Sequence, residues 1–225
     1  ERDNIKLIVC GSATTWMTGK LLGDKGGLHN RVTRKLYLAP FTLGETAEFL
    51  HNNGVKWTHH QIAECYMIMG GTPYYLDMID KSMGLPANID KLFFEEGAEL
   101  SKEYDILFRS LFKDATIYRR IVEQLAKKSA GMTREQLASA IKMSDGGKLS
   151  EALDNLISCD FLRKYNAFGN LNKGAIYQLT DLYTLFYLKW VKENAEHNAT
   201  QWSETIDSPR HRAWSGYAFE QLCLH

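Results

Sequence analysis

The stretch NIKLIVCGSATTWM, residues 4–17, determines how the rest of the chain is interpreted. Residues 5–10 form a nearly continuous apolar run that is rich in β-branched side chains. Such a run is typical of a strand covered on both faces inside a parallel sheet. Ser12 and Thr14 follow it, where an open α/β sheet places its ligand crevice. Because a parallel sheet needs further strands, we expect those strands to lie upstream of the first residue.

Composition gives few grounds for a special environment. The chain has 225 residues, and its 27 basic and 27 acidic residues balance, so net charge gives no argument for nucleic acid or a membrane. No apolar run approaches the roughly 20 residues of a membrane span, and no signal peptide is visible. The four cysteines are far apart and form no C-x-x-C pair, which indicates a reducing cytoplasm and no zinc site.

Short helices follow the first strand. Residues 35–38 are predicted to form a second strand, which ends before Pro40. A capping box from Thr42 to Glu45 starts a helix, and a second helix is predicted over 58–69. The sequence GGTP at 70–73 stops that helix and starts another over 74–82. Short helices interrupted by glycine and proline are consistent with a helical lid beside a sheet.

The pattern changes in the second half, after a predicted linker at 84–88. Helices are expected over 104–112, 117–128, 134–141 and 149–159, and strands over 161–166 and 175–179. Three helices followed by a β-hairpin is the order of a winged helix-turn-helix. An aromatic helix over 181–193, a polar linker and a last helix over 214–224 complete the chain.

Three motifs follow one another along the chain: a strand ending in CGSA, then NRVTRKLYLAPFTLGETAEFL, then GGTPYYL. In this order they resemble the prokaryotic P-loop ATPases of the AAA+/STAND group, and the resemblance covers residues 5–220. The relevant branch joins its ATPase to a winged helix and often to a restriction-endonuclease-like carboxyl-terminal domain. The resemblance implies a mainly α fold with an α/β remnant: the carboxyl-terminal strands of a P-loop ATPase sheet, a helical lid and a winged helix-turn-helix.

The implied domains divide the whole chain. Residues 1–41 would end the ATPase α/β core, 42–102 would form the helical lid, and 103–193 would form the winged helix domain. Residues 194–225 would be a linker and the start of a nuclease-like domain.

One departure from the family is plain, because no Gly-x-x-x-x-Gly-Lys-[Ser/Thr] motif is present. Gly19-Lys20 and Gly147-Lys148 are both followed by leucine, where a magnesium-binding hydroxyl is needed. ATP and Mg²⁺ are therefore expected as cofactors of a longer parent ATPase, and this segment alone should bind neither tightly. Self-association and DNA are the further partners to test, and no membrane partner is expected.

The resemblance assigns catalytic roles to four residues. Ser12, with Thr14 as the alternative, matches a sensor that holds the attacking water or contacts the γ-phosphate. Arg31, and next to it Arg34, match an arginine directed at a neighbouring subunit's phosphate, a role that suits a permanently charged, forked donor. The structural alternatives are a capped turn for the hydroxyl residues and two solvated arginines before an edge strand.

Gly70, Gly71 and Pro73 resemble the Gly-x-Pro element of the lid, where proline would lie against the adenine or ribose. The same residues are equally explained as a helix stop followed by a helix start.

The winged helix also raises the question of DNA binding. Its recognition helix offers Lys148 beside Glu151 and Asp154, a poor set for phosphate contacts, while Arg163, Lys164 and Lys173 on the hairpin could reach a backbone. A role in coupling domains is favoured. No metal site is predicted, because His59 and His60 are adjacent on a helix and Glu220 lacks the strands of a metal centre.

The leading hypothesis is therefore the carboxyl-side portion of an ATP-binding switch protein. The competing hypothesis is a non-enzymatic winged-helix DNA-binding regulator or a scaffold module.

Overall fold

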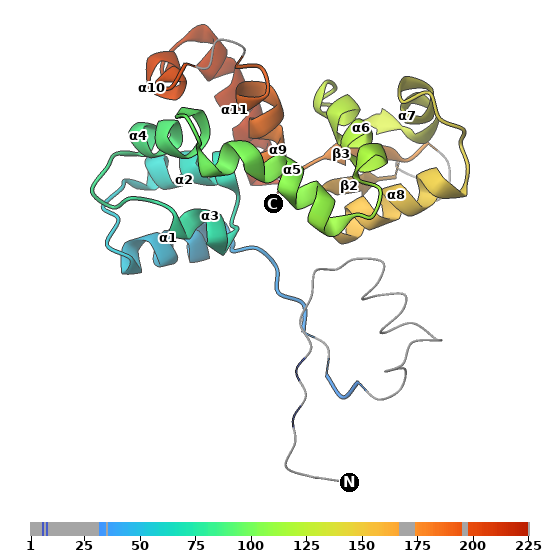
Figure 1. The fold of residues 1–225 in the computed structure, drawn as a ribbon, viewed down its shortest axis with the longest axis horizontal. Helices are drawn as coiled ribbons and strands as arrows, with labels where there is room; N and C mark the ends of the chain where they lie inside the picture. Colours follow the sequence, from blue (N-terminus) through green and yellow to red (C-terminus); the bar gives the residue numbers. More distant parts are fainter. Residues whose placement is uncertain are drawn as a thin grey trace.

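The computed structural model describes residues 6, 8, 32–34, 36–166, 174–194 and 198–224. The described part is mainly helical and has one small antiparallel sheet (Figure 1). This agrees with the prediction of a mainly α chain.

The first half is a group of short helices. They are α1 (Leu43–Asn52), α2 (His59–Met69), α3 (Pro73–Asp77), α4 (Leu85–Ile89), the π-helical turn η2 (Asp90–Phe94) and α5 (Glu99–Leu111). The capping box of Thr42 with Glu45 is confirmed, and Thr58 forms a second box with Gln61. The predicted linker at 84–88 is wrong, because α4 occupies it.

The second half carries the sheet. Its elements are α6 (Ala115–Ala126), β1 (Met132–Thr133), α7 (Arg134–Ala140), α8 (Gly147–Ser158), β2 (Leu162–Tyr165) and β3 (Ile176–Leu179). The strand order is β1-β3-β2, and both pairs are antiparallel. The predicted hairpin is confirmed, with Arg163 opposite Gln178. Helices α6 and α8 pack on this sheet.

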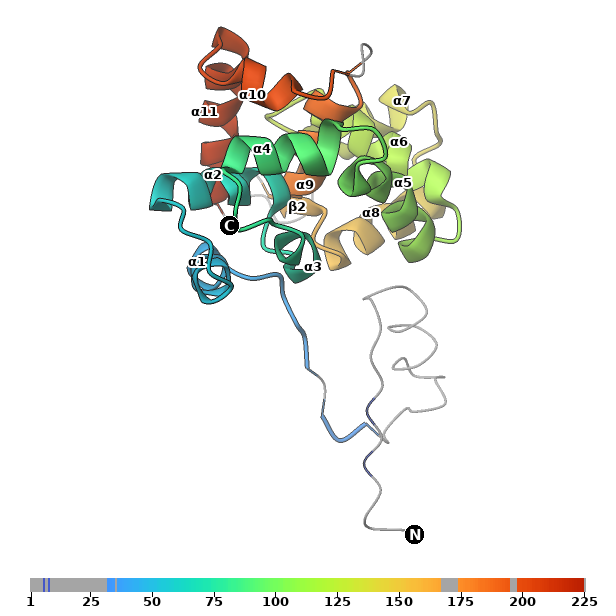
Figure 2. The same ribbon diagram turned by 60° about the vertical axis from the view of Figure 1, so that its left-hand side comes forward.

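The last helices return to the first half. They are α9 (Leu182–Phe186), the π-helical turn η3 (Tyr187–Val191), α10 (Gln201–Thr205) and α11 (Pro209–Cys223). Helices α9 and α11 both pack on α2, and α10 packs on α4 and η2, as Figures 1 and 2 show. The rings of Trp190, Trp202 and Trp214 meet edge to face at this junction, with centroids 5.1–6.2 Å apart.

The predicted strand at 35–38 is not found in its described residues, 36–38, which lie in neither a helix nor a strand. Leu36 and Leu38 are 80% and 85% exposed. A strand needs a neighbour for its backbone hydrogen bonds, and none of the described residues supplies one here. The predicted strand at 5–10 falls mostly outside the described residues; Lys6 and Ile8 are exposed and belong to neither a helix nor a strand.

Candidate functional site

The turn between α2 and α3 contains the glycines and proline singled out in the sequence. Gly70 ends α2: its amide donates to the carbonyl of Tyr66 at 2.8 Å, and its φ is 65°, a backbone conformation that favours glycine. Pro73 is the first residue of α3, where no backbone donor is needed. The sequence therefore predicted this local turn correctly.

Gly71 is pressed against the chain that enters α1. The amide of Phe41 donates to the carbonyl of Gly71 at 2.8 Å, and the hydroxyl of Tyr66 donates to the carbonyl of Phe41 at 3.0 Å. A Cβ on Gly71 would lie 1.8 Å from the carbonyl oxygen of Phe41. Because that approach is impossible for any side chain, glycine is required at position 71. The turn and the entry to α1 thus form one unit, which we call the Phe41–Gly71 clamp.

Of the residues that follow the clamp, some face the solvent and one faces the protein interior. Pro73 is exposed and Tyr74 is 58% exposed, so both present their side chains outward. The next ring, Tyr75, is buried, and its hydroxyl donates to the Glu103 carboxylate at 3.2 Å. Burial, followed by nearby carboxylates, raises the pKa of Tyr75 and keeps it a neutral donor. Pro73 and Tyr74 form the exposed surface of this turn.

The predicted catalytic residues are mostly not described. Ser12, Thr14 and Arg31 lie outside the described residues, and Arg34 is exposed. The predicted catalytic roles of these four residues therefore stay predictions.

Of the residues predicted to contact DNA, Arg163 and Lys164 lie on opposite faces of the sheet. Arg163 donates to the carbonyl of Leu224 at 2.6 Å and to the hydroxyl of Tyr165 at 3.0 Å, so it is already used in holding the end of α11. Lys164, its neighbour on β2, points to the opposite face of the sheet and lies over the ring of Tyr177 at 5.9 Å. Lys173 lies outside the described residues.

The recognition-helix candidate α8 has mixed charge. Lys148 is exposed in its first turn, and Glu151 and Asp154 are exposed further along it. Carboxylates on the same exposed side weaken attraction to phosphate. The structure thus gives this helix no basic surface of its own.

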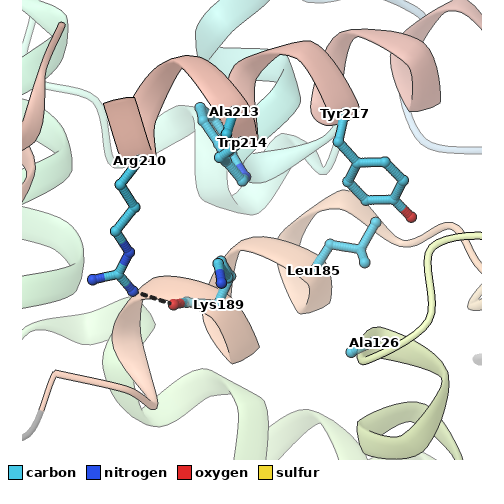
Figure 3. Close-up of a pocket in the computed structure, with 7 residues that line it drawn as sticks. All are labelled: Ala126, Leu185, Lys189, Arg210, Ala213, Trp214 and Tyr217. Carbon is cyan, nitrogen blue, oxygen red and sulfur yellow. Dashed lines mark hydrogen bonds between the residues drawn. The ribbon is translucent and has the colours of Figure 1, made fainter. Parts of the chain in front are cut away.

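A pocket that sequence reasoning missed lies between α11, α9–η3 and the end of α6 (Figure 3). Its volume is about 270 Å³, and its lining is formed by Ala126, Leu185, Lys189, Arg210, Ala213, Trp214 and Tyr217. Figure 3 shows Tyr217 and Leu185 pointing toward one another, with Arg210 at the other end, where its guanidinium meets the Lys189 carbonyl at 3.1 Å. Burial raises the pKa of Tyr217.

A second pocket of about 240 Å³ lies between the first turns of α1 and α2, where His59 and Gly44 border it. His59 and His60 are exposed there, and among the residues with assigned positions no group of three His, Cys, Asp or Glu side chains could hold a metal ion. Nor is any helix in this part of the chain both long and apolar enough to cross a membrane.

The chain is similar to an uncharacterized protein of Methanocaldococcus jannaschii, with 27% identity over 196 residues. The match covers 86% of this chain and 43% of that relative, so the chain spans less than half of the relative's length. No family profile and no solved structure matches the chain.

Proposed function

We propose that this chain is the carboxyl-side portion of an AAA+/STAND-type ATP-binding switch protein. In the longer parent, ATP binding and hydrolysis would rearrange two parts of this chain: a helical lid over residues 42–102, and a winged helix domain over residues 103–193. ATP and Mg²⁺ would be held mainly by a P-loop half upstream, with Pro73 and Tyr74 of the lid contacting the nucleotide.

The topology of the second half supports the winged-helix assignment. A helix, a short strand, two helices and a hairpin follow one another, and the short strand β1 pairs with β3. A hairpin that follows the last of three helices is the order expected of this module. The topology alone leaves the function open, because one fold serves many functions.

The Phe41–Gly71 clamp is the observation that carries the switch proposal. Residues 36–40, which the family resemblance places at the exit from an ATPase sheet, lead directly into Phe41. Through the hydrogen bonds of Phe41 to Gly71 and Tyr66, a displacement of this segment would be transmitted to the lid turn. Such a rigid link allows one local change to bias a larger rearrangement.

The same segment also contacts the second half. The hydroxyl of Tyr37 donates to the carboxylate of Asp160, which follows α8, and this hydrogen bond raises the pKa of Tyr37 to about 12. Residues 37 and 41 therefore contact the two parts that the switch would move. This arrangement favours a coupling role for the winged helix.

The competing function, a DNA-binding regulator, rests on the exposure of Lys148 and Lys164. Two lysines supply few phosphate contacts, and Arg163 is already bonded to Leu224. The geometry therefore gives the coupling role better support.

The test is ATP turnover by the natural full-length protein compared with residues 1–225 alone. We expect Mg²⁺-dependent ATP hydrolysis by the full-length protein and none by the shorter chain. A full-length sequence without a P-loop, or a full-length protein that neither binds nor hydrolyses ATP, would overturn the proposal.

A further inference from the structure

The pocket between α11, α9–η3 and α6 has the features of a binding site for a small molecule. Three helical segments from distant parts of the sequence line this open pocket, so its shape depends on tertiary packing. Ala126 and Ala213 leave room where larger side chains would fill the space, and the rings of Trp214 and Tyr217 supply apolar surface. Mostly apolar linings with a few polar groups are typical of small-molecule sites.

The charged side chains around the pocket determine whether a positively or a negatively charged ligand is favoured. Arg210 is paired with the Glu193 carboxylate at 3.0 Å, and its guanidinium lies 4.3 Å from the ring centroid of Trp190, so its charge is largely used within the protein. The ammonium of Lys189 has no hydrogen-bond or ion-pair partner among the residues that the structure describes. Lys189 is therefore the cation left to pair with a ligand, and an anionic group is favoured at this end.

From these features, we infer that the pocket binds a small amphipathic anion, an aromatic or branched aliphatic group that carries one carboxylate. The apolar group would lie between Leu185, Trp214 and Tyr217, and the carboxylate would lie beside Lys189 (Figure 3). A volume of about 270 Å³ lies just below the usual range of about 300–1,000 Å³ for ligand sites, which favours a small molecule over a larger one. The inference is independent of the proposed ATP switch.

The position of the pocket gives such a ligand a structural consequence. Ala126 belongs to the sheet-bearing half, while Lys189 and Trp214 belong to helices that pack on the first half. A bound molecule would therefore contact both halves at once and stabilise their packing.

The test uses 4-phenylbutyrate as the probe and 4-phenylbutan-1-ol as its neutral counterpart. Binding to the 225-residue chain at pH 7 is followed by methyl NMR of Ala126, Leu185 and Ala213. For a ligand of roughly a dozen non-hydrogen atoms, binding in the millimolar range is expected. We expect saturable shifts at these methyl groups with both probes, and tighter binding of the carboxylate.

Two variants test separately how the Lys189 charge and the space of the pocket contribute to binding. Lys189→Gln should weaken binding of the carboxylate about fivefold and leave the alcohol unchanged, as expected for one exposed ion pair. Ala213→Leu should abolish binding of both probes, and because Ala213 is exposed the added side chain does not enter the core. Lys102→Gln and Ala140→Leu, both at exposed helix positions, are the matched controls.

The absence of saturable shifts up to about 50 mM probe, which is above the millimolar range expected for this ligand size, would overturn the inference. So would unchanged carboxylate binding in Lys189→Gln, or shifts that persist in Ala213→Leu.

Discussion

The backbone amide of Trp202 donates a hydrogen bond of 2.8 Å to the carboxylate of Asp90, which lies 112 residues earlier in the chain. The amide of Ser203 donates to the same carboxylate at 3.1 Å, and so does the Ser203 hydroxyl. Asp90 is only 5% exposed, so its charge is satisfied almost wholly by the start of α10. This contact fixes the last helices of the chain to η2.

Replacing Asp90 with alanine should therefore destabilise the packing of α10. The change leaves the buried amide of Trp202 and the amide of the exposed Ser203 without their acceptor, and we expect the free energy of unfolding to fall by about 3 kcal/mol. Asp90→Asn keeps one acceptor oxygen, and we expect it to lower the free energy of unfolding by about half as much as Asp90→Ala. Urea unfolding followed by tryptophan fluorescence measures both. The exposed Asp77→Ala is the control, and an Asp90→Ala variant as stable as this control would contradict the assignment.

Gly71→Ala tests the Phe41–Gly71 clamp. Because the new Cβ would lie 1.8 Å from the Phe41 carbonyl oxygen, the turn must open. We expect a loss of about 3 kcal/mol or more in unfolding free energy. Gly44→Ala is the matched control: nothing lies within 4 Å of its added Cβ, and in a helix it should be neutral or stabilising by up to about 1 kcal/mol. Equal stability of the two variants would show that the clamp does not form.

Local chemistry explains which parts of the fold could be predicted. Thr42, Thr58 and Thr133 each cap a helix with a partner three residues later, a signal contained in four residues of sequence. The linker predicted at 84–88 is wrong, although Gly84 and Pro86 are residue types that usually interrupt helices. In the structure they stand at the N-cap and in the first turn of α4, where both residue types are tolerated.

The candidate sites could be predicted from the sequence only in part, because they depend on tertiary contacts. The turn at 70–73 follows from its own residues, but its partner Phe41 lies almost thirty positions earlier and carries no spacing signal. The pocket in Figure 3 combines Ala126, Leu185 and Ala213 from three separate elements. No periodicity within one segment could have indicated that they meet.

The rate at which each cysteine thiol is modified should depend on its burial. Burial, and then the charge of Glu64, raises the pKa of Cys65 to about 12, so at pH 8 only about one thiol in ten thousand is ionised. We expect iodoacetamide to modify the exposed Cys223 and to leave Cys65 unmodified until the protein unfolds, as measured by peptide mapping. Modification of Cys65 as fast as Cys223 in the native protein would contradict its burial.

The raised pKa of Cys65 also predicts the alkaline stability. Its folded value, about 12, lies above the ordinary thiol value of 9.0. The unfolded state therefore loses its proton first, and the stability that this thiol contributes is fully present below pH 9 and declines as the pH rises toward 12. Cys65→Ala should lessen that decline in urea unfolding between pH 9 and 11. An unchanged decline would exclude this cause.

Arg163 separates the coupling role from DNA binding. Arg163→Ala removes the bond to the Leu224 carbonyl and should cost about 1 kcal/mol of stability. The coupling account expects the affinity for duplex DNA at low salt to be unchanged in Arg163→Ala combined with Lys164→Ala, with Lys102→Ala as control. A salt-dependent affinity that falls at least fivefold in the double variant alone would support the DNA-binding regulator instead.

The most direct test of the switch is hydrogen exchange in the natural full-length protein, compared between Mg²⁺ADP and a non-hydrolysable ATP analogue. The account predicts a nucleotide-dependent change in amide protection at Phe41 and over residues 70–78, accompanied by a change in the segment around Asp160. Identical protection in both nucleotide states at all of these positions would contradict it.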